Sequence, residues 1–207
     1  IVASDPSDEQ RRRLRDAIGI GVAKDNVKPA RCPRVLLAVK PQVLPGVLDG
    51  IAGTVRDDTL VISIAAGTDT SGIDERLGGR GRIVRVMPNT PMLVGAGMSA
   101  IAAGPRATKD DLAWTHALFS ACGQAVYVNE DDMDAVTAVS GSGPAYFFYL
   151  VEAMIAAGVA DRLAPPVAHE LAVQTCLGAG RMLAETGEDP AELRRRVTSP
   201  GGTTQAA

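Results

Sequence analysis

Short apolar runs alternate with amphipathic stretches up to about residue 129 of the chain. An uninterrupted apolar run such as residues 34–39 or 60–64 is typical of a strand buried on both faces of a sheet. Strands that alternate with helices at this spacing predict right-handed crossovers and a mostly parallel sheet. The expected strands are residues 1–4, 34–39, 60–64, 83–87, 96–102 and 124–128, and the expected helices between them are residues 7–18, 43–55, 71–77 and 108–121.

The pattern changes after residue 129, where strand-like runs stop and helical spacing continues. We therefore predict an α/β, Rossmann-type parallel sheet, incomplete at its start, over residues 1–129, and an all-α domain over residues 130–207. The helices that begin near Pro144 and Pro165 are apolar around most of their circumference, which favours a subunit interface. The helices expected in this half are residues 131–139, 144–157, 165–185 and 190–197.

Composition excludes several classes of protein. The 207 residues are 46% hydrophobic and 22% charged, and the net charge of −3 comes with three Tyr, three Phe and one Trp, so nucleic-acid binding is not expected. The three cysteines have no histidine at ligand spacing, so we expect no metal site and no disulfide framework. The longest apolar stretch, residues 146–160, contains Glu152 and is short for a bilayer, so we expect no membrane partner and a cytoplasmic location.

Residues that follow strands carry the first candidate chemistry, because ligands of open α/β sheets bind beyond the carboxyl ends of the strands. Asp5 follows the first strand, where an acid can accept hydrogen bonds from ribose hydroxyls. Lys40 directly follows an apolar strand and could hold a phosphate, a carboxylate or no ligand. The glycine turn G-x-G-x-x-G is not found after a strand, because Gly19 and Gly21 follow a helix. We expect that turn to be encoded upstream of Ile1.

Two clusters of small residues and proline, residues 139–146 and 197–204, lie where helices are expected to begin. Such positions leave backbone N–H groups and hydroxyls without intrahelical partners, which suits a small anion. An ordinary loop is the alternative interpretation for each cluster.

The chain resembles the pyrroline-5-carboxylate reductases over its whole length. The motifs that carry the resemblance are residues 38–42 (AVKPQ), 63–67 (SIAAG), 85–91 (RVMPNTP), 134–146 (DAVTAVSGSGPAY) and 198–204 (TSPGGTT), in the order and at the spacing of that family. The last two motifs in combination are the most specific.

The resemblance implies an NADPH or NADH site, a substrate site and an interlocked homodimer that can build a larger homo-oligomer. It places the cofactor against Asp5, Asn26, Ala38, Val39, Lys40, Pro41, Ile64, Ala65 and Ala66. It places the substrate near Lys40, Glu130, Gly202, Thr203 and Thr204, with the last three holding the carboxylate from the partner subunit. Thr204 would be the catalytic hydrogen-bond donor to the imine nitrogen.

The implied reaction is reduction of 1-pyrroline-5-carboxylate to L-proline by hydride transfer, the last step of proline synthesis. A reductase of another cyclic imine and a non-catalytic nucleotide-binding or assembly subunit are the alternatives. A β-hydroxy-acid enzyme is disfavoured because the helical half contains no lysine. The choice between NADH and NADPH stays open, since Asp5 favours a free 2′-hydroxyl whereas residues 11–13 (RRR) or Asn26 could serve a 2′-phosphate.

Overall fold

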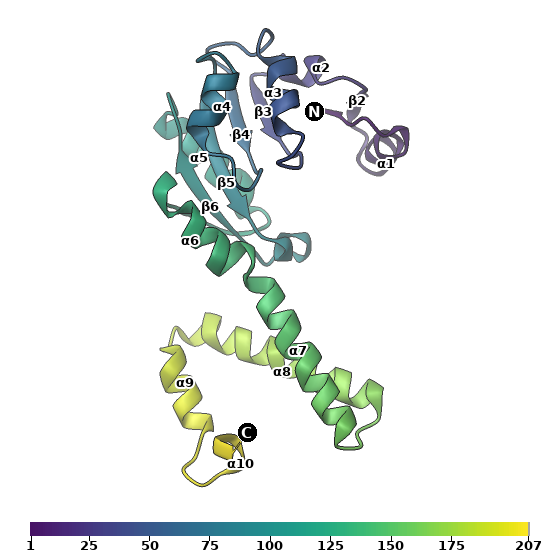
Figure 1. Ribbon diagram of the computed structural model, residues 1–207, viewed down its shortest axis with the longest axis vertical. Coiled ribbons are helices and arrows are strands. Elements are labelled where there is room, and N and C mark those ends of the chain that lie inside the picture. The colour runs from purple at the N-terminus through teal and green to yellow at the C-terminus, as the bar shows by residue number, and fades with distance from the viewer. Residues whose placement is uncertain (207) are drawn as a thin grey trace. The chain divides into compact units, whose positions relative to one another are not determined.

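The computed structural model describes residues 1–206, which fold as two compact units, Ile1–Pro144 and the part of the chain from Ala145 onward (Figure 1). The first unit contains two sheets. A two-stranded parallel sheet pairs β1 (Val2–Ser4) with β2 (Gly21–Ala23), and a five-stranded sheet has the order β3-β4-β5-β6-β7. The larger sheet consists of β3 (Arg34–Leu37), β4 (Leu60–Ser63), β5 (Arg82–Pro88), β6 (Gly97–Ala103) and β7 (Gly123–Tyr127).

The larger sheet is mostly parallel, as the alternating pattern predicts, with one exception. Strands β3, β4 and β5 run parallel, β6 is antiparallel to β5, and β7 is parallel to β6. The exception follows from the connection: only the short 3-10 turn η1 (Thr90–Val94) separates β5 from β6, and a parallel crossover needs about a dozen residues or more.

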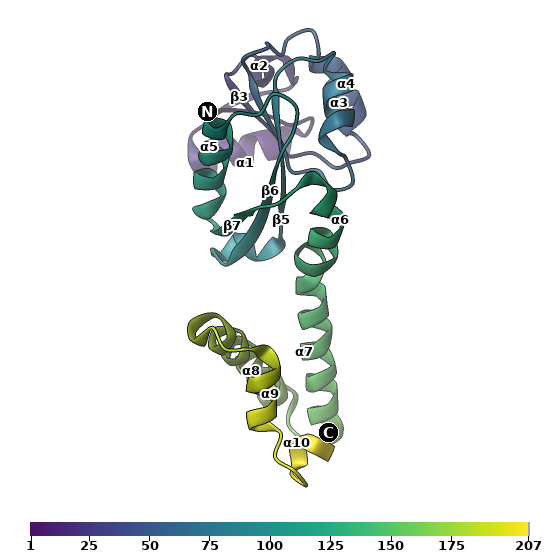
Figure 2. The ribbon, with the colours of Figure 1, turned by 90° about the vertical axis from the view of Figure 1, so that its left-hand side faces the viewer.

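Helices cover both faces of the larger sheet, as Figure 2 shows edge-on, with α5 (Lys109–Ser120) on one face and α3 (Leu44–Ile51) and α4 (Thr70–Arg76) on the other. All four residues of β4 are buried, as expected for a central strand. In β3 only Val35 and Leu37 are buried, so the expectation that this run is buried on both faces is wrong. The strand lies at the edge of its sheet, and Arg34 on its open face stacks over Trp114 with 4.6 Å from Cζ to the ring centroid.

The N-terminal strand and helix lie where the sequence predicts them. Helix α1 (Asp8–Ile18) begins after Ser7, whose Oγ accepts a hydrogen bond from Gln10 N. Strand β2 and helix α2 (Val27–Ala30) were not predicted, because segments of three and four residues are too short to show a period. The β1–α1–β2 part lies beyond the β3 edge of the larger sheet (Figure 1).

Residues 130–144 are helical but pack on the sheet of the first unit. The segment consists of a 3-10 turn η2 (Glu130–Asp132), α6 (Met133–Val136) and a π-helical turn η3 (Thr137–Gly141), and leads into α7 (Gly143–Ala160). Met133 is buried in a cluster with Ala100 and Ala102 of β6. The compact units therefore divide at residue 144, some fifteen residues after the change in sequence pattern, because tertiary packing and helical spacing need not change at the same place.

The second unit contains the rest of α7, α8 (Pro165–Thr186), α9 (Pro190–Val197) and the short α10 (Thr203–Ala206), at the positions where helices are expected. Within residues 1–206, one helical segment, Glu130–Ala160 with 31 residues, is long and apolar enough to cross a membrane by length and composition alone. The apolar stretch at residues 146–160 is the C-terminal half of this segment, because α7 continues the helical turns that begin at Glu130. Large apolar side chains exposed on α7 and α8 include Tyr146, Phe147, Phe148, Leu150, Leu171 and Leu177.

A buried carboxylate stabilises the start of α5 and its attachment to β5. Asp111 accepts hydrogen bonds from Arg82 Nε at 2.7 Å and from Thr108 Oγ1 at 2.7 Å, and Thr108 in turn caps the helix. Burial raises the pKa of the Asp111 carboxyl, but the hydrogen bonds from Arg82 and Thr108 outweigh it and lower the pKa to about 2.

We predict that Asp111→Asn lowers the free energy of unfolding at pH 7 by about 2 kcal/mol, because it removes the ion pair with Arg82 and weakens the cap. The folded-state pKa lies below the ordinary 3.8, so this stabilisation is present above pH 4 and is lost as the pH falls toward 2. Urea titrations of the wild type and of Asp111→Asn, at pH 7 and at the lowest pH that keeps them folded, measure this difference in stability. The exposed neighbour Asp110→Asn is the control, and equal stability of wild type and Asp111→Asn at pH 7 contradicts the prediction.

Candidate nucleotide and substrate site

The carboxyl ends of β3 and β4 lie side by side at one edge of the larger sheet. Leu37 pairs with Ser63, and Ile64 N donates to Leu37 O at 3.2 Å, so the residues that follow each strand are neighbours. Ser63 Oγ accepts from Ala65 N at 3.3 Å and fixes the turn after β4. The structure thus brings together seven expected cofactor residues: Ala38, Val39, Lys40, Pro41, Ile64, Ala65 and Ala66.

The small and cyclic side chains at this edge leave room for a flat ligand. Ala65 is buried, Ile64 and Ala66 are half-buried, and Ala38 and Pro41 are exposed. The Lys40 side chain is exposed, while its carbonyl oxygen accepts from Val43 N and Leu44 N and starts α3. The backbone of Lys40 is therefore fixed, and its ammonium group is at the surface.

The other two expected cofactor residues, Asp5 and Asn26, lie together at the carboxyl ends of β1 and β2. Ser4 Oγ donates to Asn26 Oδ1 at 2.7 Å and joins the ends of the two strands. Asp5 Oδ1 accepts from Ser7 N at 2.7 Å, which holds the carboxylate in the turn that precedes α1. A carboxylate and a side-chain amide at this position match the hydroxyls of an adenosine ribose.

Glu130 is part of a partly buried ion pair that the motifs did not predict. Arg85, 5% exposed on β5, donates from Nη1 to Glu130 Oε1 at 2.7 Å, and the same oxygen accepts from Thr70 N at the start of α4 at 3.3 Å. Glu130 Oε2 is buried without a hydrogen-bond partner in the described part of the chain. Glu130 therefore joins β5, α4 and η2, and Oε2 is left for a ligand or a water. The sequence feature that could have indicated this ion pair is Arg85, which lies among the apolar residues of β5.

The cluster at residues 139–146 is not the bare helix start that we expected. A new helix, α7, begins at Gly143 as expected, but the π turn η3 precedes it and Ser142 N donates to Thr137 O. Asn89 Nδ2 donates to the carbonyl oxygen of Ser140 at 3.2 Å, and Asn89 Oδ1 accepts from Met98 N at 2.8 Å. The cluster thus holds the loop after β5, and Gly141 leaves space for the Met87 methyl, 2.6 Å from where a Cβ would lie.

The tail forms a tight turn followed by a helix start, as predicted. Gly201 has φ of 71°, which favours glycine, and Gly202 N donates to Ser199 O at 2.9 Å. Helix α10 begins at Thr203, and the side chains of Thr203 and Thr204 are exposed. Because Gly202 N is used within the turn, the first-turn N–H groups of Thr203 and Thr204 are better placed for an anion than that of Gly202.

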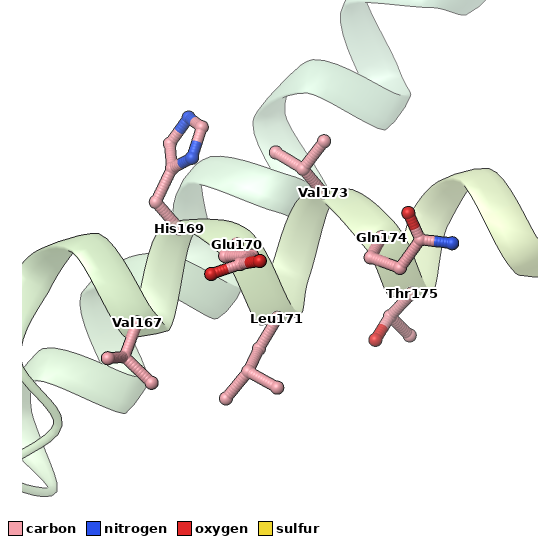
Figure 3. A pocket seen from close by; sticks show the side chains of 7 residues that line it. All are labelled: Val167, His169, Glu170, Leu171, Val173, Gln174 and Thr175. Carbon is pink, nitrogen blue, oxygen red and sulfur yellow. The ribbon is translucent and has the colours of Figure 1, made fainter.

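Shallow depressions on the second unit contain none of these residues. One is an open patch on α8 from Val167 to Thr175, where His169 and Glu170 project among apolar neighbours (Figure 3). The other lies between α7 and α8 and is lined by Phe148, Val151, Ile155, Cys176 and Leu177, with Glu152 and Val173. Within residues 1–206, no group of three or more His, Cys, Asp or Glu side chains could hold a metal ion.

Comparison with known proteins agrees with the motifs. A family model described as pyrroline-5-carboxylate reductase dimerisation matches residues 130–207, and a model described as NADP oxidoreductase, coenzyme F420-dependent, matches residues 1–67. The pyrroline-5-carboxylate reductase of Synechocystis sp. is 46% identical over 207 residues, which is 100% of this chain and 77% of that protein. The chain belongs to the pyrroline-5-carboxylate reductase family.

Solved structures of the family share the fold. The enzyme from Coxiella burnetii has a TM-score of 0.90 at 37% identity, covering 100% of this chain and 77% of that one. The Plasmodium falciparum enzyme, solved with NADP bound, has a TM-score of 0.88 at 32% identity, covering 99% and 76%. The resemblance inferred from the motifs and the predicted Rossmann-type fold with a helical dimerisation domain are confirmed.

We predict that Glu130→Gln lowers the free energy of unfolding by about 3 kcal/mol, because it leaves the buried Arg85 guanidinium without a counter-charge. The double variant Arg85→Met/Glu130→Gln should recover part of the loss, since no unpaired charge remains. Urea unfolding of Glu130→Gln, of Arg85→Met and of the double variant gives the coupling free energy between the two residues. The exposed pair Arg56–Asp58, 2.9 Å apart, is the control, and Asp58→Asn should leave the unfolding midpoint unchanged. Additive single and double variants would contradict the coupling.

Proposed function

We propose that this chain reduces 1-pyrroline-5-carboxylate to L-proline with NADPH or NADH as the hydride donor. The observation that carries the proposal is 46% identity to a pyrroline-5-carboxylate reductase over the whole of this chain. The candidate cofactor-binding residues of the first unit support this proposal. Asp5 and Asn26 suit ribose hydroxyls, and the small residues after β3 and β4 suit a nicotinamide ring.

The residues of this chain have limited chemistry to perform, because the cofactor, when bound, supplies the hydride. Addition of a hydride to the imine carbon breaks the C=N π bond and moves its electron pair to the ring nitrogen, which takes a proton. A hydroxyl donor near that nitrogen stabilises the developing charge. We assign this donation to Thr204 Oγ1, directly or through water.

The remaining substrate contacts are binding contacts. Backbone N–H groups at Thr203 and Thr204 suit the substrate carboxylate, and Gly202 gives the close backbone approach. Lys40 supplies a positive charge at the edge of the sheet, and Glu130 offers its unpartnered Oε2. Substitution of each residue in turn separates its contribution to substrate binding from those of the others.

We also propose that the protein is a homodimer through its helical unit, that dimers associate into a larger homo-oligomer, and that the enzyme is cytoplasmic. The match of residues 130–207 to a dimerisation domain supports the dimer. The exposed apolar side chains of α7 and α8 support it as well, because contiguous apolar surface of this kind marks an interaction site. We therefore assign the exposed apolar surface of α7, which follows Pro144 in the same helical segment, to subunit contact.

We predict that Thr204→Val lowers kcat for 1-pyrroline-5-carboxylate by roughly ten- to a thousand-fold, because it removes a hydrogen bond that strengthens in the transition state. Thr204→Ser keeps the hydroxyl and should retain much of the rate. In steady-state kinetics, Lys40→Ala should instead raise KM at unchanged kcat, because binding lost equally in ground and transition states leaves kcat alone. Lys109→Ala, at the start of α5, is the charge-matched control. Wild-type kcat in Thr204→Val would remove Thr204 from the mechanism.

We predict that Phe148→Glu and Leu177→Glu each abolish the dimer at micromolar concentration, because a carboxylate would be buried against apolar surface. Light scattering coupled to size exclusion measures the mass in solution. Ile18→Glu, which changes an exposed apolar residue at the end of α1, is the matched control and should remain dimeric. An active wild-type monomer at micromolar concentration argues against the assembly.

A further inference from the structure

The chain carries opposite signals for the 2′ position of the adenosine ribose. Asp5 follows β1, where an acid accepts a hydrogen bond from a free 2′-hydroxyl and repels a 2′-phosphate. Residues 11–13 (RRR), six to eight positions later, could instead neutralise a 2′-phosphate. The contacts around α1 decide between these signals.

Arg11 is the arginine of this run that turns toward Asp5, and both of its Nη atoms already have a partner. Its Nη1 donates to the carbonyl oxygen of Asp5, its Nη2 forms an ion pair with Asp8, and its side chain is 12% exposed. Asp8 thereby places a counter-charge beside Arg11 within the same helix turn. Arg12 and Arg13 are exposed and, at about 100° per residue along a helix, project from other sides of α1.

The Asp5 carboxylate is anchored by one oxygen and available at the other. Oδ1 accepts from Ser7 N at 2.7 Å, and Ser7 Oγ accepts from Gln10 N, so the carboxylate is held by the cap of α1. This leaves Oδ2 for a ligand. Across the strand ends, Asn26 Oδ1 accepts from Ser4 Oγ at 2.7 Å, which leaves the amide N–H groups of Asn26 for the same ligand.

We propose that this chain selects NADH over NADPH and that Asp5 is the residue that discriminates between them. The free 2′-hydroxyl donates to Asp5 Oδ2, whereas a 2′-phosphate meets the Asp5 carboxylate, and the nearby Arg11 is paired with Asp8. The inference rests on the nucleotide site of the proposed function and goes beyond it. The NADP in the Plasmodium falciparum structure is a property of that protein.

The test is the binding of NADH and of NADPH to the full-length enzyme by isothermal titration calorimetry, without substrate. The wild-type enzyme should bind NADH roughly 10- to 100-fold more tightly than NADPH, as expected when one hydrogen bond to a charged group is replaced by repulsion. Asp5→Ser should weaken NADH binding, tighten NADPH binding and bring the two constants within about threefold. Because screening weakens charge repulsion, higher salt should narrow the difference in the wild type and leave it unchanged in Asp5→Ser.

Asp16→Ser is the matched control. It removes the same charge at the far end of α1, where Asp16 pairs with Arg15, and should keep the wild-type ratio. Equal affinity of the wild type for both nucleotides, an unchanged ratio in Asp5→Ser, or binding of neither nucleotide overturns the inference. Selective NADH binding without reduction of 1-pyrroline-5-carboxylate would refute the proposed function and support this assignment.

Discussion

The parallel register of β3, β4 and β5 is the constraint on which the nucleotide site depends. Leu37 pairs with Ser63, and Ser63 pairs with Arg85, so the three strands reach their carboxyl ends at one edge of the sheet. The register is fixed by burial at β3, since a slip of one residue would turn Val35 and Leu37 to the exposed face. Loops that are far apart in sequence become neighbours for this reason.

The same edge is stabilised by polar contacts from the segment after β7. Glu130 binds Arg85 and the first N–H of α4, and Asn89 binds Ser140 in the π turn. A buried ion pair of this kind adds little net stability, but removing one partner is costly. We interpret these contacts as fixing where the loops after β4 and β5 lie, which matters more to a binding site than to the fold.

The helical unit presents the opposite situation, with apolar side chains that its own fold does not bury. Helices α7 and α8 are rich in aromatic and aliphatic residues, and many of these side chains are exposed within a single chain. The hydrophobic effect requires this surface to be covered, and a dimerisation domain supplies the covering element from a second copy. Folding of this unit and assembly of the protein are therefore coupled.

The sequence by itself determined the element types and the family. The apolar runs at β4 and β5 and the helices that begin at Pro165 and Pro190 are local signals, and each is found in the structure where it was predicted. The residues after β3 and β4 could be assigned to one ligand edge, because parallel strands impose that geometry.

Only the tertiary structure decided the rest. Four features depend on partners that are distant in sequence. They are the strand β2, the antiparallel direction of β6, the exposure of one face of β3, and the packing of residues 130–144 on the sheet. The tertiary structure also decided that Arg85 pairs with Glu130 and that Arg11 is occupied by Asp8. A side chain's available hydrogen-bonding atoms depend on which neighbours the fold brings to it, and a sequence pattern specifies the chemical group but not those neighbours.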